Sequence, residues 1–127
     1  MWDLATDPVS HKLILEFFNA QKILSAVCHG PAAFANVKLA DGSFFLAGQP
    51  VAGFSNSEEE IAGYTSAMPF SLEDKLNEAS GGNYQKAEQD WAEKVVTGYG
   101  GRLITGQNPA SGKLLGEKLL EGLKKGK

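Results

Sequence analysis

The sequence predicts an α/β domain in which helices cover a parallel β-sheet, and three features near its start indicate this class. A helical apolar pattern covers residues 8–21, and a short, mostly apolar segment follows at 23–28. A sharp turn at His29-Gly30-Pro31 then leads at once into another segment of good packing residues. A helix, a buried strand, a sharp turn and a second helix in this order are typical of parallel sheets covered by helices.

The first helix is predicted from its start signal and from the spacing of its apolar side chains. Asp7 is a suitable N-cap, and Pro8 suits the first helical position. Two apolar pairs with a spacing of four residues follow, Leu13 with Phe17 and Ile14 with Phe18. Because residues four apart lie on one side of a helix, we expect a helix over 8–21 with an apolar stripe.

The rest of the chain alternates short strand and helix signals. We expect strand pieces at 44–47 and 51–54, a short helix that begins after the capping residues 55–57, and another that Ser71 caps. Strand candidates at 94–97 and 102–105 flank a glycine-rich turn and predict a hairpin. Asn108-Pro109 marks the entry to a last helix. Its expected inner face consists of Leu115, Leu119, Leu120 and Leu123.

Length and composition exclude several classes of function. The 127 residues include 12 Lys and Arg and 15 Asp and Glu, which give a net charge of -3. Without a basic block there is no electrostatic reason to expect nucleic acid or an anionic membrane as a partner. The first residues do not resemble a secretory signal, and no apolar run is long enough for a membrane span. With Cys28 as its single cysteine the chain has no disulfide and no Cys-rich zinc site, and we expect a cytoplasmic location.

The segment Ala26-Val27-Cys28-His29-Gly30-Pro31 has the pattern of a nucleophile elbow. Such an elbow needs a strand that stops abruptly, a nucleophile on the turn, a helix that begins at once, and small residues two positions to either side. Ala26 and Gly30 occupy those two positions. A thiol at a helix N-terminus is expected to favour the thiolate, and the backbone N–H of His29 is placed to bind an oxyanion. The alternative is a buried cysteine at a strand end beside an incidental histidine.

The elbow and four further segments resemble the ThiJ/PfpI superfamily, which has the class I glutamine amidotransferase-like fold. The resemblance is greatest to its glyoxalase III branch of stress-induced, chaperone-like heat-shock proteins. The similar segments, in chain order, are residues 1–4 (Met-Trp-Asp-Leu), 26–32 (Ala-Val-Cys-His-Gly-Pro-Ala), 51–60, 68–73 and 103–111. The resemblance runs from Met1 to about Leu123 without large gaps. It implies a flavodoxin-like parallel sheet sandwiched by helices.

The resemblance implies a role for three residues. Cys28 would attack the aldehyde of methylglyoxal or a similar 2-oxoaldehyde, His29 would act as acid/base or orienting imidazole, and Glu59 would orient His29. If the register is off by one residue, Glu58 takes the place of Glu59. The implied product is a 2-hydroxy acid, D-lactate from methylglyoxal, and the branch needs no glutathione, metal or organic cofactor. The implied partner is the small 2-oxoaldehyde or a glycated protein, and a homodimer is left open.

The chain departs from the family in its first half. The opening strands, a glutamate that faces the nucleophile and a Gly-Gly-His-Gly turn have no counterpart here, so we expect residues 1–127 to be the C-terminal portion of one domain. The N-terminal strands of the sheet would be missing, and the chain would be an incomplete catalyst. The alternatives left open are a stress chaperone or protein deglycase, a redox-sensing protein, and an inactive fragment. With only His11 and His29, the late His-x-Glu pair of glutamine amidotransferases and the second histidine of cysteine proteases have no candidate.

Overall fold

The computed structural model describes residues 1–126 and contains four α-helices and three β-strands within that range. In chain order these are α1 (Pro8–Asn19), β1 (Leu24–Val27), α2 (Asn56–Ala62), α3 (Leu72–Ala79), β2 (Val95–Gly98), β3 (Leu103–Gly106) and α4 (Gly112–Lys125). A short 3₁₀ helix, η1 (Gly30–Phe34), follows the elbow, where the sequence predicted the start of a second helix. Of the described helices, none has both the length and the apolar character that crossing a membrane requires.

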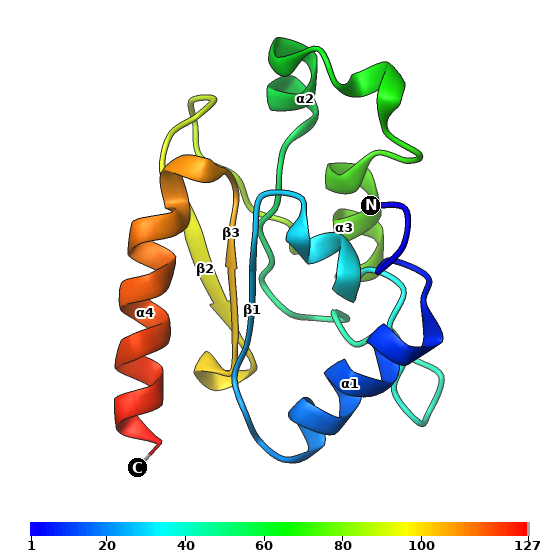
Figure 1. Ribbon diagram of the computed structural model, residues 1–127, viewed down its shortest axis with the longest axis vertical. Coiled ribbons are helices and arrows are strands. Elements are labelled where there is room, and N and C mark those ends of the chain that lie inside the picture. Colours follow the sequence, from blue (N-terminus) through cyan, green and yellow to red (C-terminus); the bar gives the residue numbers. More distant parts are fainter. Residues whose placement is uncertain (127) are drawn as a thin grey trace.

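The three strands form one sheet in the order β1-β3-β2 (Figure 1). β1 pairs with β3 in parallel, with Leu24 opposite Leu103 and Val27 opposite Gly106. β2 pairs with β3 in the antiparallel sense through the turn Tyr99–Gly101, so the predicted hairpin is confirmed. The sheet is therefore mixed, and within residues 1–126 β1 is an edge strand. This α/β arrangement confirms the predicted fold class.

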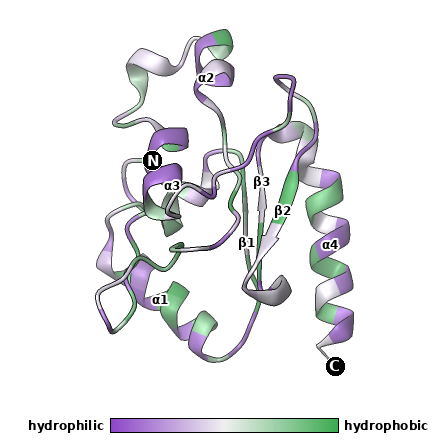
Figure 2. Cartoon of the chain, turned by 180° about the vertical axis from the view of Figure 1, so that it is seen from behind, coloured by the Kyte–Doolittle hydropathy of each residue, from purple (hydrophilic) through white to green (hydrophobic). Residues whose placement is uncertain are grey.

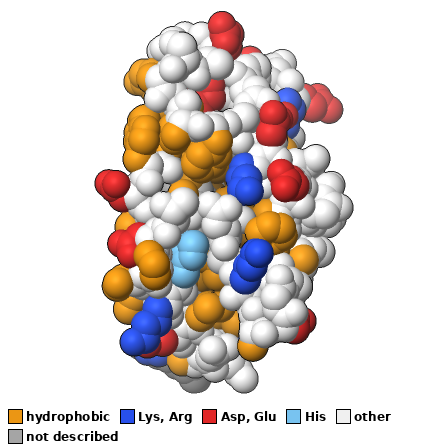
Figure 3. Space-filling view, turned by 90° about the vertical axis from the view of Figure 1, so that its right-hand side faces the viewer, with side chains coloured by type: hydrophobic (Ala, Val, Ile, Leu, Met, Phe, Trp, Pro, Cys, Tyr) orange, Lys and Arg blue, Asp and Glu red, His pale blue; other side chains and the backbone are white. Residues whose placement is uncertain are grey.

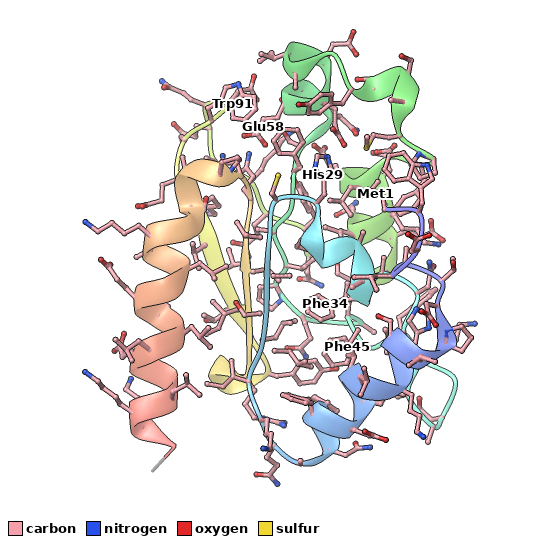
Figure 4. All side chains as sticks on the ribbon, viewed as in Figure 1. Met1, His29, Phe34, Phe45, Glu58 and Trp91 are labelled. Atoms are coloured by element: carbon pink, nitrogen blue, oxygen red, sulfur yellow. The ribbon has the colours of Figure 1, made fainter. Side chains whose placement is uncertain are left out.

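Helices lie on both sides of the sheet. Figure 1 shows α4 along one side of the strands, with α1, η1 and α3 on the other. The core fills the space between β1 and α1, where Phe34 and Phe45 lie in Figure 4. The rings of Phe18 and Tyr99 pack against Phe45 with centroid distances of 5.1 and 5.2 Å. This core supports β1, the strand that leads directly into the turn of Cys28.

Three of the predicted helix start signals are confirmed, whereas Asn108-Pro109 opens a 3₁₀ turn and α4 begins only at Gly112. The side chains of Asp7, Ser55 and Ser71 each accept a hydrogen bond from a backbone N–H in the first turn of α1, α2 and α3. Such caps satisfy donors that the helix itself leaves unpaired. The observed α1 ends at Asn19, two residues before the predicted end.

The predicted strand pieces at 44–47 and 51–54 are wrong. Those segments contribute only isolated bridges, between Lys38 and Phe44 and between Val51 and Tyr84. Phe45, Leu46 and Val51 are fully buried, and they are apolar because they fill the core from irregular segments rather than because they pair in a sheet. A short apolar run indicates burial and does not by itself distinguish a strand from a buried loop.

The predicted inner face of the last helix is only partly buried. Leu115 and Leu119 are half-buried, whereas the side chains of Leu120 and Leu123 are 53% and 51% exposed. The hydropathy pattern in Figure 2 shows apolar residues alternating with polar ones along α4. Part of the apolar face that was predicted for α4 is therefore uncovered among the described residues.

Apolar side chains are also exposed elsewhere on the described surface. They include Trp2, Leu4, Val9, Leu13 and Phe17, all from the first helix and the segment before it. Figure 3 shows hydrophobic side chains gathered between scattered charged groups on one face of the molecule. Exposed apolar patches of this kind mark surfaces that contact other polypeptide or ligand.

Candidate active site

Cys28 lies on a tight turn directly after β1. Its backbone φ is 64°, a left-handed conformation that is unusual for a residue with a side chain. The turn is fixed on both sides, because the Cys28 N–H donates to the carbonyl of Gly106 and the Cys28 carbonyl accepts from Phe54 N–H. A Cβ atom on Gly30 would lie only 3.2 Å from the Cβ of Ala26, so small residues are needed here. These are the features of a nucleophile elbow.

His29 connects the thiol to a carboxylate. Its Nδ1 lies 3.5 Å from the Cys28 Sγ, and its Nε2 lies 2.9 Å from Glu59 Oε1. Because an ionised carboxylate can only accept, Nε2 must carry the hydrogen in this contact. In the neutral imidazole Nδ1 then has the lone pair, and it is positioned to accept the thiol proton.

The two candidate glutamates of the first turn of α2 point to different partners. Glu59 bonds to His29, with its side chain 5% exposed, whereas Glu58 is fully buried and bonds elsewhere. The structure therefore brings Cys28, His29 and Glu59 together, and Glu58 is not the carboxylate that contacts the imidazole. Among the described residues the second oxygen of Glu59, Oε2, is buried and accepts no hydrogen bond.

The expectation that the elbow favours a thiolate is not met by the surroundings of Cys28. Burial raises the pKa of the Cys28 thiol, and the negative charges of Glu58 and Glu59 raise it further. The hydrogen bond from the His29 backbone N–H acts in the opposite direction and is outweighed. The helix after the elbow is a 3₁₀ turn of five residues, so its dipole is weak. The resting thiol is protonated and needs a base.

Glu58 is the centre of a buried polar cluster. Its two oxygens accept hydrogen bonds from five donors, which are Ser55 N, Ser55 Oγ, Gln107 Nε2, Asn108 Nδ2 and Trp91 N. Burial alone would raise its pKa, but these hydrogen bonds outweigh burial and lower the pKa below the usual range. Glu58 is therefore an ionised group inside the protein.

Aromatic rings border the imidazole. The Phe54 ring lies 4.6 Å from the His29 ring, and the Trp91 ring packs edge-on against Phe54 at 5.3 Å. Figure 4 shows His29, Glu58 and Trp91 together near one end of the molecule, beyond the end of β1. The buried cluster around Glu58 was not predicted from the sequence. The Ser55-x-x-Glu58 spacing of a capping box could have revealed Glu58, but nothing in the sequence predicts the turn that places Trp91.

Other features of the described surface do not extend the site. A hollow of about 880 Å³ lies between the ends of α1 and α4, and its lining, which includes Phe17, Ile23 and Leu123, contains none of the three site residues. No group of three or more His, Cys, Asp or Glu side chains that could hold a metal ion occurs within residues 1–126. His11 is half-buried and donates through Nε2 to the carbonyl of Ala5, so it is not part of the site.

A cysteine on a strand-to-helix elbow, hydrogen-bonded through a histidine to a carboxylate, is the arrangement typical of α/β proteins that use a cysteine nucleophile. A scan against models of known protein families gives no match. Known proteins nevertheless resemble the chain. Glyoxalase 3 of Candida albicans is 33% identical over 104 residues, which are 79% of this chain and 43% of the relative. Glutathione-independent glyoxalase HSP31 of Saccharomyces cerevisiae is 30% identical, over 80% of this chain and 44% of the relative.

Solved structures of related proteins also resemble this chain. The Rapid Encystment Protein of 24 kDa from Francisella tularensis superposes with a TM-score of 0.90 at 37% identity, over 96% of this chain and 52% of that one. Glyoxalase III from Candida albicans superposes with a TM-score of 0.84 at 28% identity, over 95% and 52%. The chain belongs to the glyoxalase III branch of the ThiJ/PfpI superfamily, as its motifs indicated. It spans about half the length of the curated relatives that it matches.

Proposed function

We propose that this chain carries the nucleophilic part of a glutathione-independent glyoxalase site, which converts a 2-oxoaldehyde such as methylglyoxal to a 2-hydroxy acid. The observation that supports this best is the hydrogen-bonded series Cys28–His29–Glu59 on the elbow. Relatives that are named glutathione-independent glyoxalases support the same chemistry. Cys28 would supply the thiol that other glyoxalase reactions take from glutathione.

The first step forms a bond between Cys28 and the aldehyde carbon. His29 Nδ1 accepts the thiol proton, and the resulting imidazolium is stabilised by the carboxylate of Glu59. The Sγ electron pair attacks the aldehyde carbon, and the carbonyl π electrons move to oxygen. The alkoxide then takes the proton back from His29, which completes a hemithioacetal. Since the thiol is protonated at rest, this proton transfer is what makes it a nucleophile.

The second stage is an internal oxidation and reduction that needs no external electron carrier. Transfer of the proton on the former aldehyde carbon to the ketone oxygen gives an enediol. Transfer of a proton from the hydroxyl group on that first carbon to the neighbouring carbon then leaves a thioester beside a hydroxyl group. Water then cleaves the C–S bond and releases the 2-hydroxy acid and the thiol. For methylglyoxal the product is lactate, and the resemblance implies the D enantiomer.

The length of the chain relative to its relatives bears on its place in a larger domain. We propose that residues 1–127 correspond to the C-terminal portion of the family's domain and that the family's second catalytic glutamate lies outside them. The chain's share of its relatives, about half, supports this. The reaction is proposed for the cytoplasm, where a lone thiol stays reduced. The exposed apolar side chains support association with further polypeptide, a homodimer included.

A coupled assay for D-lactate tests the function. Methylglyoxal is supplied without glutathione to the 127-residue chain and to a version lengthened to the size of its relatives. We expect D-lactate from the lengthened protein, and no D-lactate after Cys28→Ala. The matched control is Glu60→Gln, because Glu60 is exposed on the same helix turn and does not contact His29. Equal turnover by the Cys28→Ala protein contradicts the assignment.

A second candidate function is that of a chaperone, which the exposed apolar residues of α1 and the segment before it favour. In that case suppression of the aggregation of an unfolded client would survive Cys28→Ala and would weaken when Leu13 and Phe17 are replaced by glutamine. The redox-sensing alternative is less well supported, because burial and two nearby carboxylates raise the pKa of the thiol that would have to be oxidised.

A further inference from the structure

We infer that Glu58, which does not contact the imidazole, is the positioning residue that holds His29 in its active tautomer and orientation. Glu58 is fully buried and occupies the third position of α2, next to Glu59. A carboxylate in the interior is costly unless hydrogen bonds compensate it, and this one accepts five. A carboxylate with this many hydrogen bonds fixes the positions of the backbone segments that donate to it.

The first route from Glu58 to His29 runs through the start of α2. Glu58 accepts hydrogen bonds from the backbone N–H and the hydroxyl of Ser55, while its own N–H donates to the Ser55 hydroxyl at 3.2 Å. Gln107 and Asn108, just beyond β3, bind the same carboxylate. The first turn of α2 is therefore attached to the central strand of the sheet. That turn presents Glu59 Oε1 to His29 Nε2 at 2.9 Å.

The second route runs through Trp91. The Trp91 N–H donates to Glu58 Oε2 at 2.9 Å, and Trp91 has a φ of 65°, an unusual conformation that needs external support. The indole packs edge-on against Phe54, whose ring contacts the His29 ring. Glu58 thus holds the hydrogen-bonded edge of the imidazole through Glu59 and its ring face through Trp91 and Phe54. Figure 4 shows Glu58 between Trp91 and His29.

Removal of the Glu58 carboxylate is therefore expected to change the tautomer of His29, although Glu58 does not contact the imidazole. In Glu58→Gln the amide NH₂ group faces several donors of the cluster, which repel it. The start of α2 and the Trp91 turn then shift, and Glu59 no longer fixes the hydrogen on Nε2. The titratable groups around the thiol are His29, Glu58 and Glu59, so the readout must report on the imidazole itself.

The ¹⁵N shifts of the histidine ring nitrogens provide that readout, measured at a pH where both imidazoles are neutral. His11 is the internal reference, because its Nε2 donates to the Ala5 carbonyl and makes no hydrogen bond to Glu58, Glu59 or His29. We expect the His29 Nε2 shift to move from that of a protonated nitrogen toward the average of the two tautomers in Glu58→Gln, in the same direction as in Glu59→Ala. We expect no change for His11, and none for either histidine in Glu60→Gln.

A folded Glu58→Gln protein with unchanged His29 shifts would overturn the inference, because Glu58 would then serve stability alone. If Glu58→Gln does not fold, Gln107→Leu replaces it, since this change removes one of the five donors. In Gln107→Leu we expect a smaller change of the His29 Nε2 shift in the same direction. An unchanged His29 shift in this variant would count against the inference. The catalytic meaning rests on the proposed function. The histidine shifts can be measured without turnover. A failure of the inference about Glu58 is therefore distinguishable from a failure of the proposed glyoxalase function.

Discussion

The reactivity of Cys28 depends on a balance between its burial and its neighbours. Burial and the carboxylates of Glu58 and Glu59 raise the pKa of the thiol, whereas the His29 backbone N–H lowers it by less. A protonated thiol is a poor nucleophile, so in the proposed reaction its proton must leave before Cys28 attacks the substrate. His29 Nδ1 lies within reach of the thiol proton. The hydrogen bond from Nε2 to Glu59 keeps the imidazole hydrogen on Nε2 and leaves the lone pair of Nδ1 free to accept that proton.

The raised pKa predicts how alkylation of Cys28 depends on pH. Since Cys28 is the only cysteine, iodoacetamide labelling followed by mass spectrometry measures it alone. We expect the rate to rise with pH with a midpoint above that of an unstructured cysteine peptide, because the buried thiol ionises later. A midpoint below that of the peptide would show that the elbow stabilises the thiolate after all.

The lowered pKa of Glu58 predicts an acid-dependent loss of stability. Because its pKa is lower in the folded than in the unfolded chain, the ionised group stabilises the fold above the unfolded value of about 4.3. This contribution is lost as the pH falls from there through the folded value. Thermal melts between neutral pH and pH 3 should show the loss, and Glu58→Gln should reduce the dependence on pH.

The same substitution should lower the free energy of unfolding at neutral pH by about 1–3 kcal/mol for each donor left unpaired. Glu60→Gln, which removes the same charge from an exposed position of α2, is the control and should change little. A Glu58→Gln protein as stable as the Glu60→Gln protein at neutral pH would contradict the hydrogen-bonded cluster described above.

At the scale of elements, α1 shows how far the sequence pattern determined the packing. The pairs Leu13–Phe17 and Ile14–Phe18 have identical spacing, and both were predicted to lie on the apolar stripe. In the structure Ile14 and Phe18 face the core, whereas Leu13 and Phe17 are 52% and 46% exposed. Spacing groups residues on one side of a helix, but which part of that side is covered depends on the neighbouring elements.

This difference predicts unequal effects of two adjacent substitutions. The Phe18 ring packs edge-on against Phe45 and Tyr99, and the Arg102 guanidinium lies 4.8 Å from its centroid. Phe18→Ala should therefore lower the free energy of unfolding by about 3 kcal/mol, the lower end for a phenylalanine in a core. Phe17→Ala should change it by less than about 0.5 kcal/mol. Denaturant unfolding measures both, and equal losses would contradict the burial assigned to α1.

Sequence reasoning located the site better than it located the strands. The elbow, the helix caps and the hairpin depend on residues close in sequence, and such local signals can be read directly. The segment around Phe45 and Leu46 was predicted to be a strand because it is a short apolar run. A buried loop has the same apolar composition as a buried strand, so the run does not distinguish them. Three of the five donors of Glu58 come from residues 91, 107 and 108, and contacts between residues so far apart in sequence produce no spacing pattern.

At the scale of the whole molecule, a well-formed site coincides with a surface rich in exposed apolar residues. The site residues meet at the end of β1, which is an edge strand within the described residues. The apolar side chains of α1 and α4 that were predicted to line a core are partly exposed. Together with the chain's share of its relatives, these observations support the proposal that further polypeptide completes the domain.

The central claim is that Cys28 forms a bond to the aldehyde carbon of a 2-oxoaldehyde. Methylglyoxal labelled with ¹³C at the aldehyde carbon tests this most directly, because the bond can form whether or not the chain completes the reaction. We predict that the ¹³C spectrum of the mixture contains a hemithioacetal signal that is lost in Cys28→Ala. A spectrum of the Cys28→Ala protein identical to that of the unaltered chain, or an unaltered chain without the signal, would contradict the account.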